Sequence, residues 1–253
     1  MTSLRARARA GETLLGCFLT WPVAGVVELA ALAGFDFVLI DVEHGFFSIE
    51  SVASTILACD GAGIAPLVRP PSALSDQVGR YLDAGAAGTL LPRVESVAMA
   101  RSAVEALKFA PLGRRGLGGV RANRYATEPL AGFVTRANEE TLVAVQIERE
   151  GALAELSGLA EEPAVDVLFV GPSDLSQALG SPGDTSSERF QSALARVASE
   201  ATRAGKTAGI MVGSREQIPA LRDLGYRIFT TSDRALVLES AKNWREALPV
   251  PLR

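Results

Sequence analysis

Histidine, cysteine and lysine are scarce in this sequence, and their scarcity excludes several kinds of site. The chain has a single histidine, His44, so one subunit cannot supply the two or three histidines of a typical catalytic zinc site. Its two cysteines, Cys17 and Cys59, have neither the number nor the spacing of a disulfide framework or a cysteine zinc site. We therefore expect a protein of the reducing cytoplasm.

Concentrated positive charge is also lacking. The formal net charge is -4 and the arginines are scattered along the chain, which gives no electrostatic footprint for nucleic acid or an anionic membrane. The sequence has no G-x-S-x-G elbow and no Walker-type loop, which argues against serine hydrolases and nucleotide-driven enzymes. We expect small molecules as partners.

One long apolar run needs an explanation, because a basic N-terminus followed by residues 14–33 imitates a signal peptide or a membrane span. Pro22 and Glu28 interrupt the run. They divide it into a β-rich piece, 14–21, and an amphipathic piece, 23–33. The run is therefore interpreted as the opening strand and helix of the fold.

Short apolar runs alternate with helical patterns along the whole chain. The runs of strand character are 14–20, 36–41, 64–69, 88–92, 141–148, 166–171, 207–212 and 227–231. The helical patterns are 23–33, 48–61, 72–85, 95–107, 150–161, 187–204, 214–224 and 233–247. This alternation predicts a single (β/α)8 barrel domain over residues 1–253, with a doubly wound open sheet as the alternative.

The interval 108–140 is irregular in this reading and includes the glycine-rich stretch 113–119. It is not framed as strand, tight turn and helix, so it does not fit a dinucleotide fingerprint. Either the glycines simply allow positive φ angles, or the loop closes over an anionic substrate.

Polar residues follow several of the predicted strands, where a barrel enzyme carries its reactive groups. These stretches are Asp41-Val42-Glu43-His44-Gly45, Arg69-Pro70-Pro71, Gln146-Ile147-Glu148 and Gly171-Pro172-Ser173-Asp174. Because side chains alternate along a strand, Gln146 and Glu148 point together into the barrel mouth. Glu148 and Asp174 then need a compensating partner. That partner is either Arg69, in a structural ion-pair network, or a divalent cation such as Mg²⁺ or Mn²⁺.

The other polar residues also have two interpretations. His44 is a structural histidine, or a general base that Asp41 and Glu43 orient. Arg69 forms a salt bridge, or stabilises an oxyanion or carboxylate. Ser173 caps a helix, or the turn that contains it offers backbone N–H groups to a substrate carboxylate.

The lysines argue against an enzyme that forms a Schiff base, because such an enzyme needs a lysine inside the barrel. Lys206 is expected at the start of a strand, at the bottom of the barrel. Lys108 and Lys242 fall in or beside helices.

Several of these stretches, in this order, resemble the HpcH/HpaI family of class II pyruvate aldolases over nearly the whole chain. The matching stretches are Gly34-Phe35-Asp36 through Asp41-Val42-Glu43-His44, Leu67-Val68-Arg69-Pro70, Gln146-Ile147-Glu148, Val170-Gly171-Pro172-Ser173-Asp174-Leu175-Ser176 and Ala204-Gly205-Lys206. The resemblance implies a barrel of the phosphoenolpyruvate/pyruvate-binding type with an exchanged C-terminal helix, assembled as a homohexamer.

The resemblance also assigns roles to the site residues. Glu148 and Asp174 would bind the metal, Mg²⁺ or Mn²⁺ by expectation, with Co²⁺ or Zn²⁺ as alternatives. His44 would accept the proton, Arg69 would stabilise the transition state, and Asp83 would raise the basicity of the histidine.

The implied reaction cleaves or forms a 4-hydroxy-2-oxo acid, giving pyruvate or a close 2-oxo acid plus an aldehyde through a metal-stabilised enolate. The residues implied to contact the 2-oxo acid are Gln146, Gly171, Pro172, Ser173 and Asp174. Departures from the family pattern are Arg149, which alternation aims away from the site, and a loose match over 114–125. That segment and Trp21 are expected to shape the pocket for the second substrate.

Two alternatives stay open from the sequence. One is a lyase of the citramalyl- or malyl-CoA type on a similar barrel, for which Arg114 and Arg115 are the only candidates for a CoA-binding patch. The other is a non-catalytic 2-oxo-acid binder that keeps the metal site.

Overall fold

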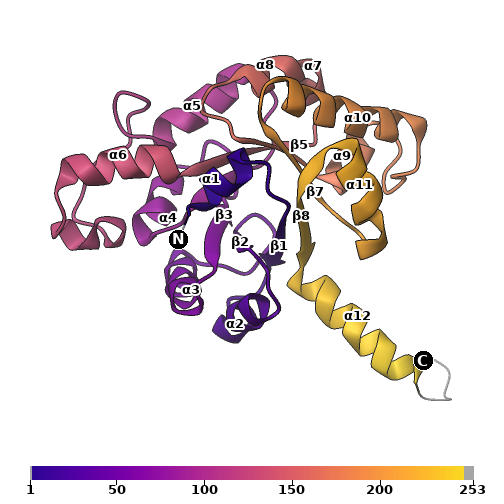
Figure 1. Cartoon of the computed structure of the whole chain (residues 1–253), viewed down its shortest axis with the longest axis horizontal. Coiled ribbons are helices and arrows are strands. Elements are labelled where there is room, and N and C mark those ends of the chain that lie inside the picture. Colours follow the sequence, from indigo (N-terminus) through magenta and orange to yellow (C-terminus); the bar gives the residue numbers. More distant parts are fainter. Residues whose placement is uncertain (1, 248–253) are drawn as a thin grey trace.

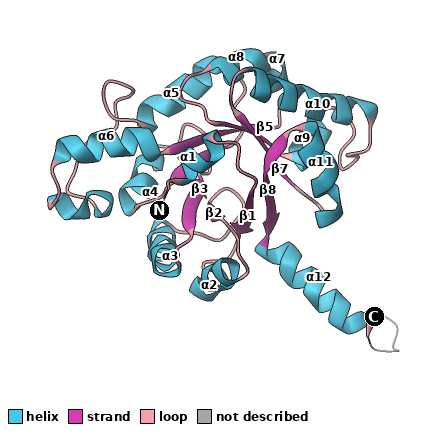
Figure 2. Cartoon of the chain, viewed as in Figure 1, coloured by secondary structure: helices cyan, strands magenta, loops and turns pink. Residues whose placement is uncertain are grey.

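Eight parallel strands close into a barrel at the centre of the computed structural model, which describes residues 2–247 (Figures 1 and 2). Each strand pairs with the next one in the chain, and β8 pairs with β1. The strands are β1 (Leu14–Leu19), β2 (Phe37–Asp41), β3 (Ala65–Arg69), β4 (Gly88–Leu91), β5 (Leu142–Ile147), β6 (Val167–Val170), β7 (Thr207–Met211) and β8 (Tyr226–Ser232). The predicted (β/α)8 barrel is confirmed, and the open-sheet alternative is wrong.

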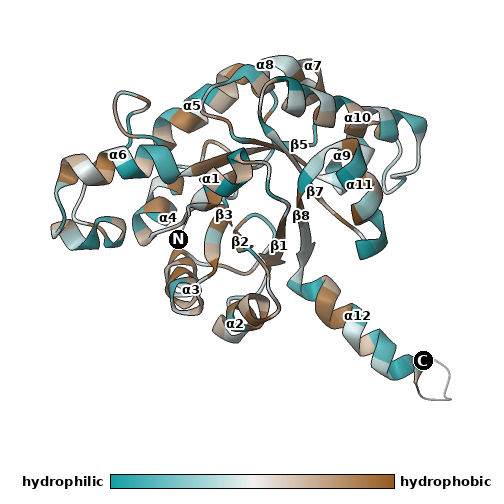
Figure 3. Cartoon of the chain, in the orientation of Figure 1, coloured by the Kyte–Doolittle hydropathy of each residue, from teal (hydrophilic) through white to brown (hydrophobic). Residues whose placement is uncertain are grey.

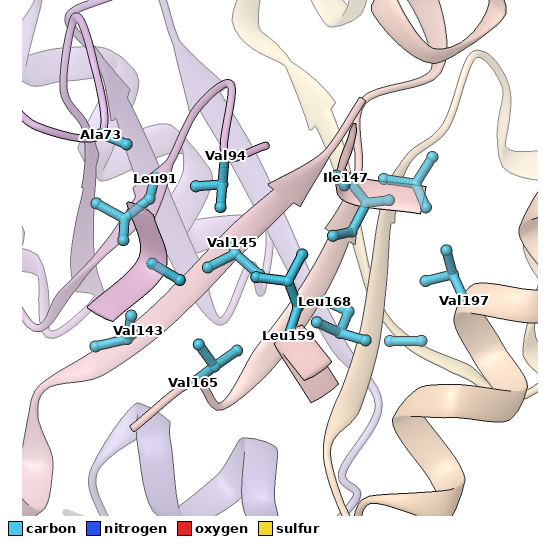
Figure 4. Close-up of a cluster of buried hydrophobic side chains, with 14 of the residues drawn as sticks. Ala73, Leu91, Val94, Val143, Val145, Ile147, Leu159, Val165, Leu168 and Val197 are labelled. Atoms are coloured by element: carbon cyan, nitrogen blue, oxygen red, sulfur yellow. The ribbon is translucent and has the colours of Figure 1, made fainter. Parts of the chain in front are cut away.

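The strands are apolar on both faces because both faces are buried. On β5, Leu142 and Ala144 belong to the core inside the barrel. The alternate residues Val143, Val145 and Ile147 pack outward against the helices (Figure 4). The same alternation turns Gln146 inward, toward the mouth of the barrel.

Helices cover the outside of the barrel. They are α2 (Ala24–Leu32), α3 (Ile49–Ala62), α4 (Val78–Ala84), α5 (Val97–Leu107), α7 (Glu150–Ala154), α8 (Leu156–Glu161), α10 (Glu188–Arg203) and α11 (Ile218–Leu224). The helix predicted over 72–85 begins only at Val78, because the residues before it form a turn. The pattern over 150–161 is two short helices that meet at Glu155.

Three helices lie outside the predicted helical ranges: α1 (Leu4–Arg9), α6 (Leu130–Glu140) and α9 (Pro172–Ala178), although a helix start was expected in the turn that contains Ser173. The prediction that residues 108–140 are irregular is therefore wrong for residues 130–140, which form α6. That helix buries only Phe133 and Asn138, so it contributes few apolar positions by which the sequence could reveal it. A short 3-10 segment, Arg121–Ala126, precedes it.

The first helix closes the N-terminal end of the barrel. Leu4 and Ala8 of α1 are buried against the barrel core, and Arg5 Nε lies 2.9 Å from a carboxylate oxygen of Asp166. The apolar run that follows α1 is β1 and α2 of the barrel, as interpreted. None of the helices within residues 2–247 has the length and hydropathy that crossing a bilayer requires.

The last helix, α12 (Asp233–Glu246), extends away from the barrel (Figure 1). Its first residue, Asp233, is buried, but the rest of the helix stands in solvent in the single chain. Figure 3 shows hydrophobic residues on this helix. The large hydrophobic side chains exposed there are Leu236, Val237, Leu238 and Trp244.

Candidate active site

The polar residues predicted to share the barrel rim do gather at the C-terminal ends of β2, β3, β5 and β6. Asp41 and Arg69 are the last residues of β2 and β3, and Glu148 directly follows β5. Asp174 lies in the first turn of α9, after β6. Parallel strands bring their carboxyl ends to one face, so residues from four parts of the chain meet there.

Asp41 organises one half of this rim. Its two carboxylate oxygens accept hydrogen bonds from Arg69 Nε at 2.9 Å and Arg69 Nη2 at 2.7 Å, and both residues are buried. Asp41 Oδ1 also accepts hydrogen bonds from the backbone N–H groups of Glu43 and His44, each at 3.1 Å. The Arg69 guanidinium lies 4.9 Å from the centre of the Phe18 ring. One buried carboxylate therefore fixes both the arginine and the loop that carries the histidine.

His44 lies at the open side of the site, with 61% of its side chain exposed. Its Nε2 is 3.9 Å from a carboxylate oxygen of Glu43, which also lies 3.4 Å from Arg69 Nε. Burial raises the pKa of Glu43, whereas Arg69, His44 and Arg93 act in the opposite direction. The imidazole thus combines access to a bound substrate with an acidic neighbour, the combination a general base needs.

Glu148 occupies the other half of the rim and is 2% exposed. Its Oε1 accepts a hydrogen bond of 2.7 Å from the backbone N–H of Arg93, and its Oε2 accepts one from Gln146 Nε2. Burial raises the pKa of Glu148 to about 7, and repulsion from Asp174 adds to the shift. Gln146 Oε1 is buried without a hydrogen-bond partner.

These residues fit a divalent cation. Among residues 2–247, no lysine or arginine lies within ion-pair distance of Glu148 or Asp174, and Arg69 is engaged by Asp41 and Glu43 instead. The structural network of Arg69 with Glu148 and Asp174 that the sequence left open is therefore not formed. The described residues hold no cluster of three or more potential metal-ligating side chains, so two carboxylates would leave several positions to water and substrate oxygens.

The start of α9 lies beside Glu148. Gly171 precedes the helix, and a Cβ atom there would lie only 2.6 Å from both Gln146 Nε2 and Glu148 Oε2. The first intrahelical hydrogen bond runs from Leu175 N–H to Gly171 C=O, which leaves the N–H groups of Ser173 and Asp174 outside the helix ladder. The interpretation of Ser173 as the helix N-cap is wrong, because Gly171 is the N-cap and Ser173 lies inside the helix.

Asp83 is not brought to His44 within one chain. It lies near the C-terminal end of α4, the end that leads into the start of β4, and its Oδ1 accepts a hydrogen bond of 2.6 Å from Arg115 Nη2. The helices of a barrel return from the catalytic rim to the opposite face, so Asp83 and His44 lie near opposite ends of the same barrel.

The loop around 114–125 lies at that same opposite face. Arg121 donates hydrogen bonds to the Ala84 carbonyl and to Asp60, both at the ends of helices that lead into strands. The loop therefore does not close over the active site of its own chain. Arg114 pairs with Glu105 near the end of α5, so neither candidate arginine for a CoA-binding patch lies at the rim.

Arg93 is the site residue that the sequence reasoning missed. It is the second residue after β4, adopts a left-handed backbone with φ 52°, and donates its backbone N–H to Glu148. Its Nε lies 3.0 Å from Glu43 Oε1, which links the two halves of the rim. Its place after a strand, like that of Arg69, was the signal that could have identified it.

Known proteins resemble this chain over most of its length. Residues 14–230 match the family described as HpcH/HpaI aldolase/citrate lyase. A hydroxypyruvate/pyruvate aldolase of Paraburkholderia phytofirmans is 35% identical over 252 residues, covering 97% of this chain and 95% of that protein. A 2-dehydro-3,6-dideoxy-6-sulfogluconate aldolase of Pseudomonas putida is 33% identical over 236 residues, covering 92% of each. The crystal structure of an HpcH/HpaI aldolase from Desulfitobacterium hafniense matches with a TM-score of 0.92 at 27% identity, covering 99% of this chain and 98% of that one.

Proposed function

This chain belongs to the HpcH/HpaI aldolase/citrate lyase family and is a class II aldolase, and we propose that it works with a divalent cation held by Glu148 and Asp174. It cleaves or forms 4-hydroxy-2-oxo acids, with pyruvate or a close 2-oxo acid and an aldehyde as the partners. The observation that carries the metal proposal is the buried carboxylate of Glu148, which repels its half-buried neighbour Asp174, with no lysine or arginine of residues 2–247 within ion-pair distance of either. Oxygen ligands of this kind suit Mg²⁺ or Mn²⁺.

The site residues divide the reaction between them. His44 takes the proton of the C4 hydroxyl group, the C3–C4 bond breaks, and its electrons become the enolate of the 2-oxo acid as the aldehyde leaves. Arg69, held in place by Asp41, offers N–H donors where negative charge develops. A bound divalent cation would supply a Lewis acid for the oxygens of the 2-oxo acid.

The 2-oxo acid has its own contacts in this proposal. The free N–H groups of Ser173 and Asp174, at the start of α9, receive the carboxylate. Gln146 lies at the floor of the site with one unpaired oxygen, placed to take part in binding once substrate and water are present. Trp21 follows β1 at the same rim, where its backbone N–H donates to Asp233 at 3.2 Å, and it contributes to the aldehyde side of the pocket.

The proposal is tested by following pyruvate release from a 4-hydroxy-2-oxo acid. We expect His44→Ala to lower kcat by roughly 10²–10⁴-fold, the usual contribution of a general base. Glu148→Ala and removal of the metal by a chelator should each abolish turnover, and Mg²⁺ or Mn²⁺ should restore the chelated enzyme but not the variant. Glu150→Ala, two residues away on the exposed start of α7, is the matched control. Full turnover in both variants and after chelation would refute the proposal.

We further propose that the protein acts in the cytoplasm and as a homo-oligomer, the hexamer of its family resemblance. Both cysteines are free and buried, and burial raises the pKa of each thiol to about 12, which keeps them unreactive. The apolar side chains of α12 are exposed in the single chain, which supports their burial against a second copy.

A further inference from the structure

Arg93 contacts the segments that follow three other strands of the barrel. It lies between the buried residues Pro92 and Val94, which anchor it on both sides. Its backbone has a φ of 52°, a left-handed conformation that non-glycine residues rarely adopt and that clusters at functional sites. In this conformation its backbone N–H donates to Glu148 Oε1, after β5, at 2.7 Å. Its side chain, which is 45% exposed, reaches the loops after β2 and β3.

The guanidinium of Arg93 holds one oxygen of Glu43. Its Nε lies 3.0 Å from Glu43 Oε1, and its Nη2 donates a hydrogen bond to the carbonyl of Pro71. The other carboxylate oxygen, Glu43 Oε2, lies 3.4 Å from Arg69 Nε and 3.9 Å from His44 Nε2. Because Arg93 engages the first oxygen, the second is left beside the imidazole.

Glu43 is a buried carboxylate whose position needs support. Its side chain is 8% exposed, and burial raises its pKa. The charged groups that face it are Asp41, His44, Arg69 and Arg93. Arg69 opposes the shift most, but its Nε and Nη2 donate to Asp41 at 2.9 and 2.7 Å. Of the ion pairs that Glu43 forms within residues 2–247, that with Arg93 is therefore both the shortest and the one that can fix its orientation.

We propose that Arg93 is a positioning residue for His44, because its side chain keeps the Glu43 carboxylate beside the imidazole while its backbone holds Glu148. The inference rests on the proposed role of His44 as the acceptor of the C4 hydroxyl proton. A negative charge close to His44 favours the imidazolium that forms when this proton arrives. Arg93 acts through Glu43 and does not touch the reacting atoms.

The NMR signal of the histidine ring tests the proposal in the metal-free protein, without turnover. His44 is the only histidine, so one titration curve reports it. In the wild-type background, Glu43→Gln should move the midpoint of this curve to lower pH by about 0.5 unit, the effect of losing a partly exposed ion pair. In an Arg93→Met background, Glu43→Gln should move it by less than about half as much. Comparing the two shifts cancels the direct effect of the Arg93 charge.

Pyruvate release supplies the second readout. Arg93→Met should lower kcat by about tenfold or more, part of the usual contribution of a general base. The affinity for Mg²⁺, measured by titration calorimetry, should stay within about threefold of the wild type, because the backbone N–H that binds Glu148 remains. Arg93→Lys should recover part of kcat, since it restores the cation but not the guanidinium fork.

Arg215→Met is the matched control. Arg215 follows β7 at the same rim, is 81% exposed and lies 3.1 Å from its neighbour Glu216. The variant removes the same charge from the same face without changing a contact of Glu43. It should leave kcat and the shift caused by Glu43→Gln at their wild-type values.

Three results would overturn the proposal. The first is no shift on Glu43→Gln in the wild-type background, which would show that this carboxylate does not act on His44. The second is a shift of equal size with and without Arg93, because the carboxylate would then keep its place alone. The third is a loss of Mg²⁺ affinity in Arg93→Met as large as the loss of kcat. A wild type that releases no pyruvate would refute the proposed function instead, and the NMR comparison would still decide whether Arg93 positions Glu43.

Discussion

Glu148 connects metal binding to pH through its burial. Desolvation is the main cause that raises its pKa to about 7, and the charge of Asp174 adds to it. A metal ligand must be deprotonated, so below about pH 7 a cation has to displace a proton from this carboxyl group. We expect the affinity for Mg²⁺ to rise with pH up to about 7 and then to level off. Titration calorimetry in buffers of different ionisation enthalpy would measure the protons released.

The same shift sets the sign of a stability effect in the metal-free protein. The pKa of Glu148 is higher in the folded state than its ordinary value of 4.5, so protonation of this residue favours the folded state. This stabilisation is complete below about pH 4.5 and is lost as the pH rises through 7. The loss is at most about 3 kcal/mol. Glu148→Gln should remove this dependence from the free energy of unfolding. An Mg²⁺ affinity that stays constant between about pH 5.5 and 7.5 would contradict both expectations.

His44 shows what single residues in a sequence do and do not reveal. Its place after a buried strand was readable, and so was the proximity of Asp41 and Glu43, which the structure confirms. The contact of Arg93 with Glu148 could not be predicted from the sequence in the same way. What Arg93 gives to Glu148 is a backbone N–H in a left-handed conformation, and side-chain identity does not encode that geometry.

At the scale of elements, the junction between β6 and α9 is a tightly fitted part of the site. We expect Gly171→Ala to displace Gln146 and Glu148, because the new methyl group would meet both side chains at 2.6 Å. Overpacking of this kind typically costs about 1–3 kcal/mol. The affinity for Mg²⁺ and kcat/KM should therefore each fall about tenfold or more, with circular dichroism unchanged.

Gly132→Ala is the control for that substitution. Gly132 lies inside α6, where a Cβ atom would meet nothing within 4 Å, so alanine should leave activity intact and raise stability by about 0.5–1 kcal/mol. If Gly171→Ala retained full metal affinity, the junction would be looser than its contacts indicate.

Elements differed in how well the sequence predicted them. The strands were found because burial on both faces makes them continuous apolar runs, and their ends then located Asp41, Arg69 and Glu148. The helix α6 was missed because it buries little, and α1 and α9 because they are short. Asp83 was placed by resemblance alone, and a sequence does not show that the end of α4 and the loop after β2 lie at opposite faces of the barrel.

At the scale of the whole molecule, the two faces of the barrel differ in the charges that they gather. The rim with Asp41, Glu43, Glu148 and Asp174 is rich in carboxylates and favours a cation. The opposite face gathers five arginines around a cavity, and four of them pair with carboxylates. The barrel strands connect the two faces but keep them apart.

The helix α12 exposes large apolar side chains to solvent in the single chain. Leu238 and Trp244 are 57% and 79% exposed, and a helix with such side chains in water is expected to bury them against another surface. We expect the wild type to sediment as an oligomer, and a Leu238→Glu, Trp244→Glu double variant to lose mass toward the monomer with the barrel still folded. Arg222→Glu, an exposed charge change on α11, is the control and should keep the wild-type mass. A double variant that still sediments like the wild type would show that α12 is not the contact between subunits.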